Sequence, residues 1–164
     1  MAYTVLTDIA ARLHAEALGC FDDTTPVPRC YELGTIPTNG GIRIEPPEWC
    51  CQPMSLWAWW DHEVVKLGGR AQGCAVKEVL NVTVALDVCT PTDPMMSEED
   101  LGEQLGLVTS LGYRMWSGLC AAFCNGALGD VVTPGPLLAD TQSGCTRFTT
   151  RWRIEDIKAF PLTL

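Results

Sequence analysis

Residues 75–89 read AVKEVLNVTVALDVC, and this stretch decides the fold. Between Val76 and Val88 the apolar side chains fall mainly on even positions, whereas polar residues such as Lys77 and Asp87 fall on odd positions. A period of two residues is typical of a β-strand with one buried face. The stretch therefore predicts a long strand, and the Thr-Pro pair that follows it marks its end.

Two helices are predicted, one before and one after this strand along the chain. Ser97 is a favourable N-cap, and the three carboxylates that follow it suit the positive end of a helix dipole. Apolar residues then recur at steps of three, four and seven, which predicts a long helix over about residues 98–123. An amphipathic pattern over about residues 3–18, closed by Gly19, predicts the other helix. Several glycines in the long helix indicate that another backbone packs closely against it.

Three further strands are predicted over about residues 29–33, 54–65 and 145–154. The stretches 34–47 and 131–143 are rich in Gly and Pro, so both are predicted to be long loops, the first holding a short strand. Helices and strands follow one another without strict βαβ alternation, which predicts an α+β fold. We expect a mostly antiparallel sheet with two helices on one face.

The composition narrows the class of protein. A length of 164 residues predicts a single domain over 1–164. Acidic residues number 20 and basic residues 11, and the net charge of −9 argues against a protein whose whole surface embraces nucleic acid. No stretch is long and apolar enough for a membrane span, and the N-terminus lacks a basic region. We therefore expect no membrane contact and no secretion signal.

Motifs for catalysis are missing from the sequence. It contains two histidines, His14 and His62, and neither stands in a metal-binding or nucleophile motif. His62 lies between Asp61 and Glu63 on a predicted strand, so alternation points it away from both carboxylates. Glycine-rich phosphate-binding motifs are also missing. We therefore predict that the protein is not an enzyme and has no catalytic residues, cofactor or metal.

The nine cysteines leave several interpretations open. Without a secretion signal we expect thiols, formed in a reducing compartment and packed as small apolar side chains. One alternative is a small intracellular thiol- or metal-dependent protein that uses Cys120 with Cys124, or Cys50 with Cys51. Another is a disulfide formed after release into an oxidising medium, with Cys50 or Cys51 as the expected participant.

A candidate interface lies on two of the predicted strands. Trp57 and Trp59 share one face of the strand 54–65, and tryptophan is enriched at interfaces. Three arginines share one face of the last strand, and we expect them to pair with carboxylates of a neighbouring copy. A solvated face and contact with phosphate are the alternatives. The candidate interface residues are Trp57, Trp59, Arg147, Arg151 and Arg153.

The order of short motifs along the chain resembles a known family. Glu48-Trp49-Cys50-Cys51 leads into the aromatic strand, Cys89-Thr90-Pro91 closes the long strand, and Pro134-Gly135-Pro136 and Ser143-Gly144-Cys145 precede the last strand. This order is similar to that of the small tail terminator proteins of siphovirus-type phages of actinobacteria, over about residues 4–156. The resemblance rests on the order and spacing of the motifs.

The resemblance implies a mixed sheet with flanking helices, assembled as a six-fold ring. Such a ring caps the head-proximal end of the tail tube, ends its polymerisation and presents a surface to the head. The implied partners are further copies of the chain in a homohexamer, the tail tube protein and the head-completion or stopper protein. Genomic DNA passes through the ring without specific binding. The protein is then made in the host cytoplasm and located in the virion neck, at the head–tail junction. A head-completion, stopper or adaptor protein of the same neck is the alternative.

Overall fold

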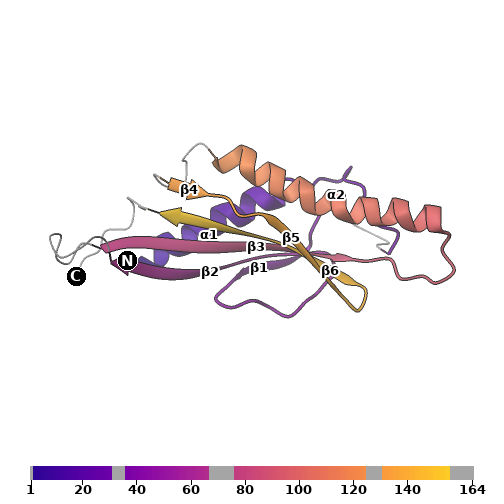
Figure 1. Ribbon diagram of the computed structural model, residues 1–164, viewed down its shortest axis with the longest axis horizontal. Coiled ribbons are helices and arrows are strands. Elements are labelled where there is room, and N and C mark those ends of the chain that lie inside the picture. The colour runs from indigo at the N-terminus through magenta and orange to yellow at the C-terminus, as the bar shows by residue number, and fades with distance from the viewer. Residues whose placement is uncertain (1, 31–35, 67–75, 125–130, 156–164) are drawn as a thin grey trace.

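The computed structural model describes residues 2–30, 36–66, 76–124 and 131–155. These residues form two helices and a six-stranded sheet, drawn in Figure 1. In chain order the elements are α1 (Ala2–Leu18), β1 (Asn39–Arg43), β2 (Ser55–Lys66), β3 (Val76–Cys89), α2 (Glu98–Phe123), β4 (Val131–Thr133), β5 (Leu137–Gln142) and β6 (Cys145–Glu155).

The sheet is mixed, and most of its strand pairs are antiparallel. β1 lies at one edge, parallel to β2, and the order continues through β3 and β6 to β4. β5 also pairs with β6, farther along the same side as β4. β3 pairs over Val76–Asp87 with β2 and over Val79–Cys89 with β6, both antiparallel. The α+β class and the mostly antiparallel sheet predicted from the sequence are confirmed.

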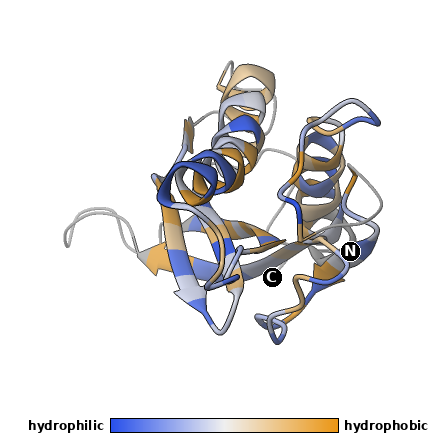
Figure 2. Cartoon of the chain, turned by 90° about the vertical axis from the view of Figure 1, so that its right-hand side faces the viewer, coloured by the Kyte–Doolittle hydropathy of each residue, from blue (hydrophilic) through white to orange (hydrophobic). Residues whose placement is uncertain are grey.

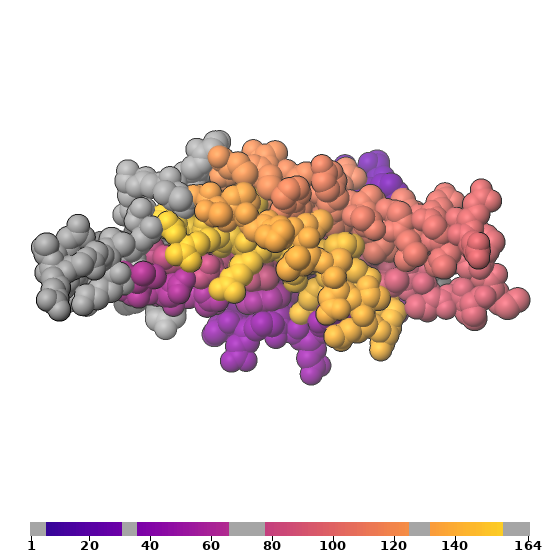
Figure 3. Space-filling view, viewed as in Figure 1, coloured from indigo at the N-terminus to yellow at the C-terminus, as the bar shows by residue number. Residues whose placement is uncertain are grey.

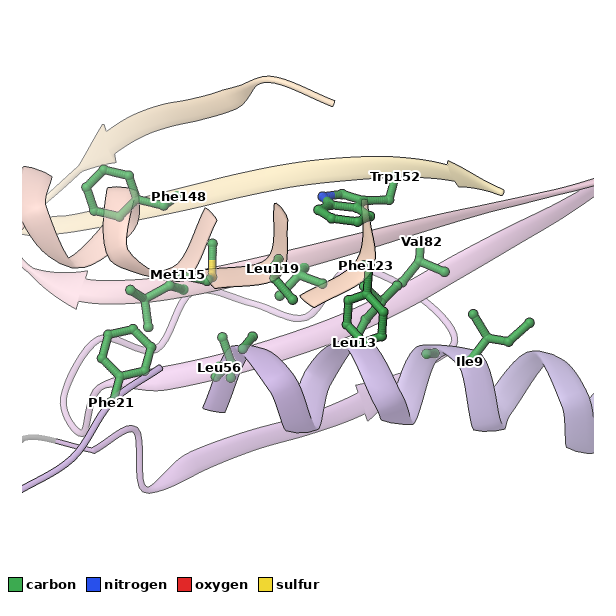
Figure 4. Close-up of a cluster of buried hydrophobic side chains, with 14 of the residues drawn as sticks. Ile9, Leu13, Phe21, Leu56, Val82, Met115, Leu119, Phe123, Phe148 and Trp152 are labelled. Carbon is green, nitrogen blue, oxygen red and sulfur yellow. The ribbon is translucent and has the colours of Figure 1, made fainter. Parts of the chain in front are cut away.

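Both helices cover the same face of the sheet, as Figure 2 shows. Even-numbered side chains of β3 and β6 belong to the core beneath them, which the alternation predicted. Leu13 of α1 and Leu119 of α2 are fully buried in this core (Figure 4). Trp152 of β6 stands edge-on to Phe123, with ring centroids 6.2 Å apart. In the described part of the chain, neither helix is long and apolar enough to cross a membrane.

Two predictions about the connecting segments are wrong. Residues 131–143, predicted as a loop, contain β4 and β5, because the free side of β6 offers hydrogen-bond partners for this segment. The strand predicted at 29–33 does not form at Arg29 and Cys30, which lie in a turn. The backbone N–H of Arg29 donates instead to the side chain of Gln104 in α2, at 2.7 Å. The other three residues of that predicted strand lie outside the described part.

β4 and β5 form one edge strand with an interruption at Pro134-Gly135-Pro136. These three residues face only two residues of β6, which is the pattern of a β-bulge. A Cβ atom at Gly135 would overlap the carbonyl oxygen of Arg151, so only glycine fits there. The carbonyl of Gly135 accepts a hydrogen bond from the indole of Trp116 at 2.9 Å, which ties the bulge to α2.

Candidate interaction surface

The face of the sheet opposite the helices carries all five residues of the candidate interface. Trp57 and Trp59 come from β2, and the three arginines come from β6. β3 lies between these strands, and its register places Trp59, Thr83 and Arg151 in one row across the sheet. We call this side of the sheet the outer face. Alternation in the sequence predicted which residues share a face, and the sheet order brings the two strands near one another.

One end of the outer face is covered by residues 47–50, from the segment between β1 and β2. Here Arg147 donates from Nε to Asp87 Oδ1 at 2.6 Å and from Nη2 to Asp87 Oδ2 at 2.9 Å. The guanidinium also donates to two backbone carbonyls of the covering segment and lies 5.3 Å from the centre of the Trp49 ring. In Figure 3 this part of the chain lies beside the β5–β6 hairpin. Arg147 is thus buried. Of the three arginines expected to be exposed on this strand, Arg151 and Arg153 remain exposed.

Asp87 is the centre of this buried group. Besides Arg147, it accepts hydrogen bonds from the backbone N–H of Cys50 at 3.0 Å and from the indole of Trp57 at 3.1 Å. Four hydrogen bonds therefore satisfy a carboxylate that is completely buried. Trp57 is also buried, with 5% of its surface exposed. Two of the five candidate residues, Trp57 and Arg147, thus make their contacts within this chain.

The other end of the outer face is exposed and carries charges of both signs. Arg151 Nη2 lies 3.0 Å from Asp61 Oδ2, and Arg153 Nη1 lies 3.5 Å from Glu63 Oε1. Asn81 of β3 lies between these strands and donates to both carboxylates. The four charged side chains are between 44% and 62% exposed. Such exposed pairs contribute at most about 1 kcal/mol each, so a partner molecule can replace them at little cost.

Exposed apolar side chains lie near both edges of the sheet. Ile44, directly after β1, is 81% exposed, and Leu138 of β5 is 60% exposed. Leu138 lies opposite Thr149 of β6, which places it on the outer face. Trp59 is half-buried at the boundary between the covered and the exposed ends, 5.7 Å from the guanidinium of Arg147. An exposed apolar side chain therefore stands near each edge of the sheet, and Leu138 of these two lies on the outer face.

His62 lies on the helix-facing side of β2, pointing away from Asp61 and Glu63 as the alternation predicted. Its Nε2 atom is 3.7 Å from the Oε2 atom of Glu78 on β3. Glu78 is buried, and within the described residues neither of its carboxylate oxygens has a hydrogen-bond partner. No group of three or more potential metal ligands occurs among the residues that the structure describes.

A disulfide joins Cys30 to Cys89 at the end of β3, and their Cα atoms are 6.2 Å apart. The sequence led us to expect thiols or, as an alternative, a disulfide that includes Cys50 or Cys51. Both expectations are wrong here, because Cys30 and Cys89 are joined whereas Cys50 and Cys51 are thiols. Contact between a turn and a distant strand end decides the pairing, and no local pattern encodes it. A pocket of about 580 Å³ opens beside this disulfide. Its lining consists of Arg29, Cys30, Cys51, Gln52, Cys89, Thr90, Pro91, Thr92, Asp93, Met96, Ser143 and Gly144.

Two pairs of thiols are in hydrogen-bond contact. Burial raises the pKa of the Cys145 thiol, and its hydrogen bond with Cys51 raises that pKa further. Cys120 and Cys124 are one helical turn apart in α2, and burial raises the pKa of Cys120 as well. A raised pKa keeps a thiol protonated near neutral pH, which is the opposite of what a nucleophilic cysteine needs.

Sequence reasoning missed two members of the buried group, Asp87 and Trp49. The signal for Asp87 was a carboxylate that stands as the one charged residue in the second half of β3. A carboxylate on a buried strand requires a cationic or hydrogen-bonding partner. That Arg147 supplies this partner depends on the register of β6, which the sequence pattern does not determine.

Comparison with known proteins does not assign a function, so a proposal must rest on the fold, the outer face and the motifs of the sequence. No protein-family model matches the chain, and no curated protein matches it.

Proposed function

We propose that this chain is a structural subunit of a phage neck: a tail terminator that forms a hexameric ring, caps the head-proximal end of the tail tube and ends its polymerisation. The observation that carries the proposal is the outer face. One end of this face bears exposed, exchangeable charges, and the exposed side chain of Leu138 lies on the same face. The motif order described above supports the same assignment.

Ring formation requires two different surfaces on each copy, because a heterologous contact joins unlike patches and closes after a fixed number of copies. The sheet offers two unlike edges. β1, parallel to its neighbour, forms one edge, and the bulged strand of β4 and β5 forms the other. Ile44 stands beside the first edge and Leu138 on the second. In the proposed ring, one edge of each copy contacts the opposite edge of the next.

The acidic balance of the chain suits the passage of DNA through such a ring. Twenty acidic residues oppose eleven basic ones. The exposed arginines Arg151 and Arg153 already have carboxylate partners in the chain. A surface of this kind repels a phosphate backbone instead of retaining it.

Deletion of this gene from the phage that encodes it tests the proposal. Tube subunits add head-to-tail, and such growth has no intrinsic end. We expect a lysate of full heads and unjoined tails of irregular or excess length, measured in electron micrographs. Supplying the wild-type protein from a plasmid should restore joined virions with uniform tails.

The same micrographs separate the alternative neck proteins. A stopper closes the filled head, so its deletion leaves heads that lose DNA and tails of normal length. Unjoined tails of uniform wild-type length would therefore contradict a terminator and assign the chain to the head side of the neck.

A further inference from the structure

We propose that Cys51 and Cys145 are an oxidation site, which forms a second disulfide and joins the segment before β2 to the start of β6. The Cys51 thiol lies against Gly144, the residue directly before Cys145, and its proximity raises the pKa of the Cys145 thiol. They lie in segments that are far apart in sequence, and each segment takes part in the buried group around Asp87. This inference is independent of the proposed neck function.

The register of the sheet explains why Cys145 is available to Cys51. Cys145 lies directly opposite Cys89, and the backbone N–H of Thr90 donates to the carbonyl of Gly144 at 2.8 Å. This pattern marks a non-hydrogen-bonded pair, in which neighbouring side chains on one face are closest. Cys89 is already bonded to Cys30 and is therefore not available to Cys145. The Cys51 sulfur also lies 3.8 Å from the Gly144 carbonyl oxygen, directly before Cys145.

Access to the pair is one-sided. Cys51 is half-buried and lines the open pocket of about 580 Å³, whereas Cys145 is buried and is not part of the pocket lining. An oxidant that enters the pocket therefore meets Cys51 first. A small disulfide such as glutathione disulfide is the class of oxidant that fits this route.

The chemistry takes two exchange steps. The Cys51 thiolate attacks one sulfur of glutathione disulfide, forming a mixed disulfide and releasing one glutathione thiolate, which takes up a proton. Cys145 then loses its proton to solvent, and its thiolate attacks the sulfur of Cys51, releasing the second glutathione. Two protein thiols are oxidised and one glutathione disulfide is reduced to two glutathione molecules.

The surroundings of Cys145 make the second step the slow one. Burial raises its pKa, the nearby Cys51 thiol and the negative charge of Asp87 raise it further, and the positive charge of Arg147 lowers it. A thiol that stays protonated attacks a disulfide slowly. The Cys51–Cys145 pair should therefore stay reduced during a brief exposure to oxidant and become oxidised only during a long one. The rate of closure should rise as the pH is raised, because the thiolate fraction of Cys145 increases.

The new bond would hold the covering segment in place. Residues 47–50 supply Arg147 with two carbonyls and Asp87 with the N–H of Cys50. Cys51 follows directly, and Cys145 stands two residues before Arg147 in β6. A bond between Cys51 and Cys145 would tie residues 47–50 to β6 and so hold them over the buried Arg147–Asp87 ion pair.

The test is disulfide mapping of the purified full chain. The protein is incubated with glutathione disulfide, remaining thiols are alkylated, and a non-reducing digest is analysed by mass spectrometry. We expect a Cys51–Cys145 linked peptide beside the Cys30–Cys89 peptide, together with a higher melting temperature after oxidation.

Two variants make the result specific. C51S should keep the Cys30–Cys89 peptide, lose the second linkage and show no rise in melting temperature on oxidation. C50S is the matched control: Cys50 is the adjacent cysteine and its sulfur accepts from Asn39, so this variant should still form the Cys51–Cys145 linkage. Alkylation of both Cys51 and Cys145 after oxidation would overturn the proposal. So would Cys145 linked to Cys89 or to Cys50.

Discussion

Asp87 joins three separate segments at a single buried carboxylate. It binds Arg147 of β6, Trp57 of β2 and the backbone of Cys50 in the covering segment. A buried ion pair adds little net stability over an apolar pair of the same shape, but removal of one partner leaves an uncompensated charge. The pair therefore fixes the relative positions of these segments more than it increases the free energy of unfolding.

Replacing Arg147 with methionine keeps most of the side-chain volume and strands the Asp87 carboxylate. We expect the Arg147→Met variant to lose about 3–5 kcal/mol of unfolding free energy, measured by urea denaturation. The exposed arginine of the same strand provides the control, since Arg151→Met should cost at most about 1 kcal/mol. Equal losses in the two variants would contradict the buried role of Arg147.

Among the elements, α2 packs closely against β6 at Gly112 and against the turn after α1 at Gly118, and in both places its neighbour is a side chain. The sequence predicted that another backbone packs against these glycines, which is wrong. A Cβ atom at Gly112 would overlap the Phe148 ring, and one at Gly118 would overlap the sulfur of Cys20. Two further glycines of α2 have no such neighbour within 4 Å: Gly102 and Gly106.

Because Gly112 has close neighbours and Gly106 has none, replacing each with alanine should change the free energy of unfolding in opposite directions. Gly112→Ala should lower the free energy of unfolding by about 1–3 kcal/mol, because the Phe148 ring must move. Gly106→Ala should raise it by about 0.5–1 kcal/mol, since alanine favours a helix and its methyl group meets no atom. Thermal and urea unfolding of both variants measure the effects. A stabilising Gly112→Ala would contradict the close packing of α2 on β6.

The long elements were predictable because each carries its own local signal. Alternation marked β3 within one residue of its bounds, and the Ser97 cap with the carboxylates after it marked the start of α2. β4 and β5 were not predictable, because an edge strand that contains Pro134-Gly135-Pro136 has the composition of a loop. It becomes a strand only where β6 supplies its hydrogen-bond partners.

The residues of the outer face were predictable where a local pattern marks them, and not where their environment comes from distant segments. Alternation alone predicted that Arg151 lies on the face of its strand away from the core, and that Trp57 and Trp59 share one face of theirs. The burial of Arg147 was not predictable, because it depends on the register that sets Asp87 opposite it and on a covering segment from elsewhere in the chain. Position along a strand is a local property, whereas exposure of that position is a property of the whole fold.

For the whole molecule, the exposed half of the outer face is where association should be most sensitive to charge. Arg151→Glu places a carboxylate beside Asp61 and reverses one sign of the proposed contact. We expect the fold to change in stability by no more than about 0.5–1 kcal/mol, while ring formation, measured by sedimentation and electron microscopy, is impaired.

Arg114→Glu provides the matched control for this variant. Arg114 is exposed on α2, and the substitution changes the net charge by the same amount on an element outside the outer face. It should assemble as the wild type does. Normal assembly of Arg151→Glu would show that the exposed arginines are a solvated surface. A strict monomer in the wild type at all concentrations, with a single copy in each virion neck, would contradict the ring itself.

The place of β6 in the sheet has a consequence for synthesis on the ribosome. β6 follows every other described element along the chain, yet it lies inside the sheet, with β3 on one side and β4 and β5 on the other. During synthesis, β3, β4 and β5 therefore emerge before β6, the strand that joins β3 to the other two. A chain released before Cys145 lacks Trp152 in its core and the three arginines of β6. We therefore expect shortened translation products not to fold, so that only a chain read through β6 reaches the structure described here.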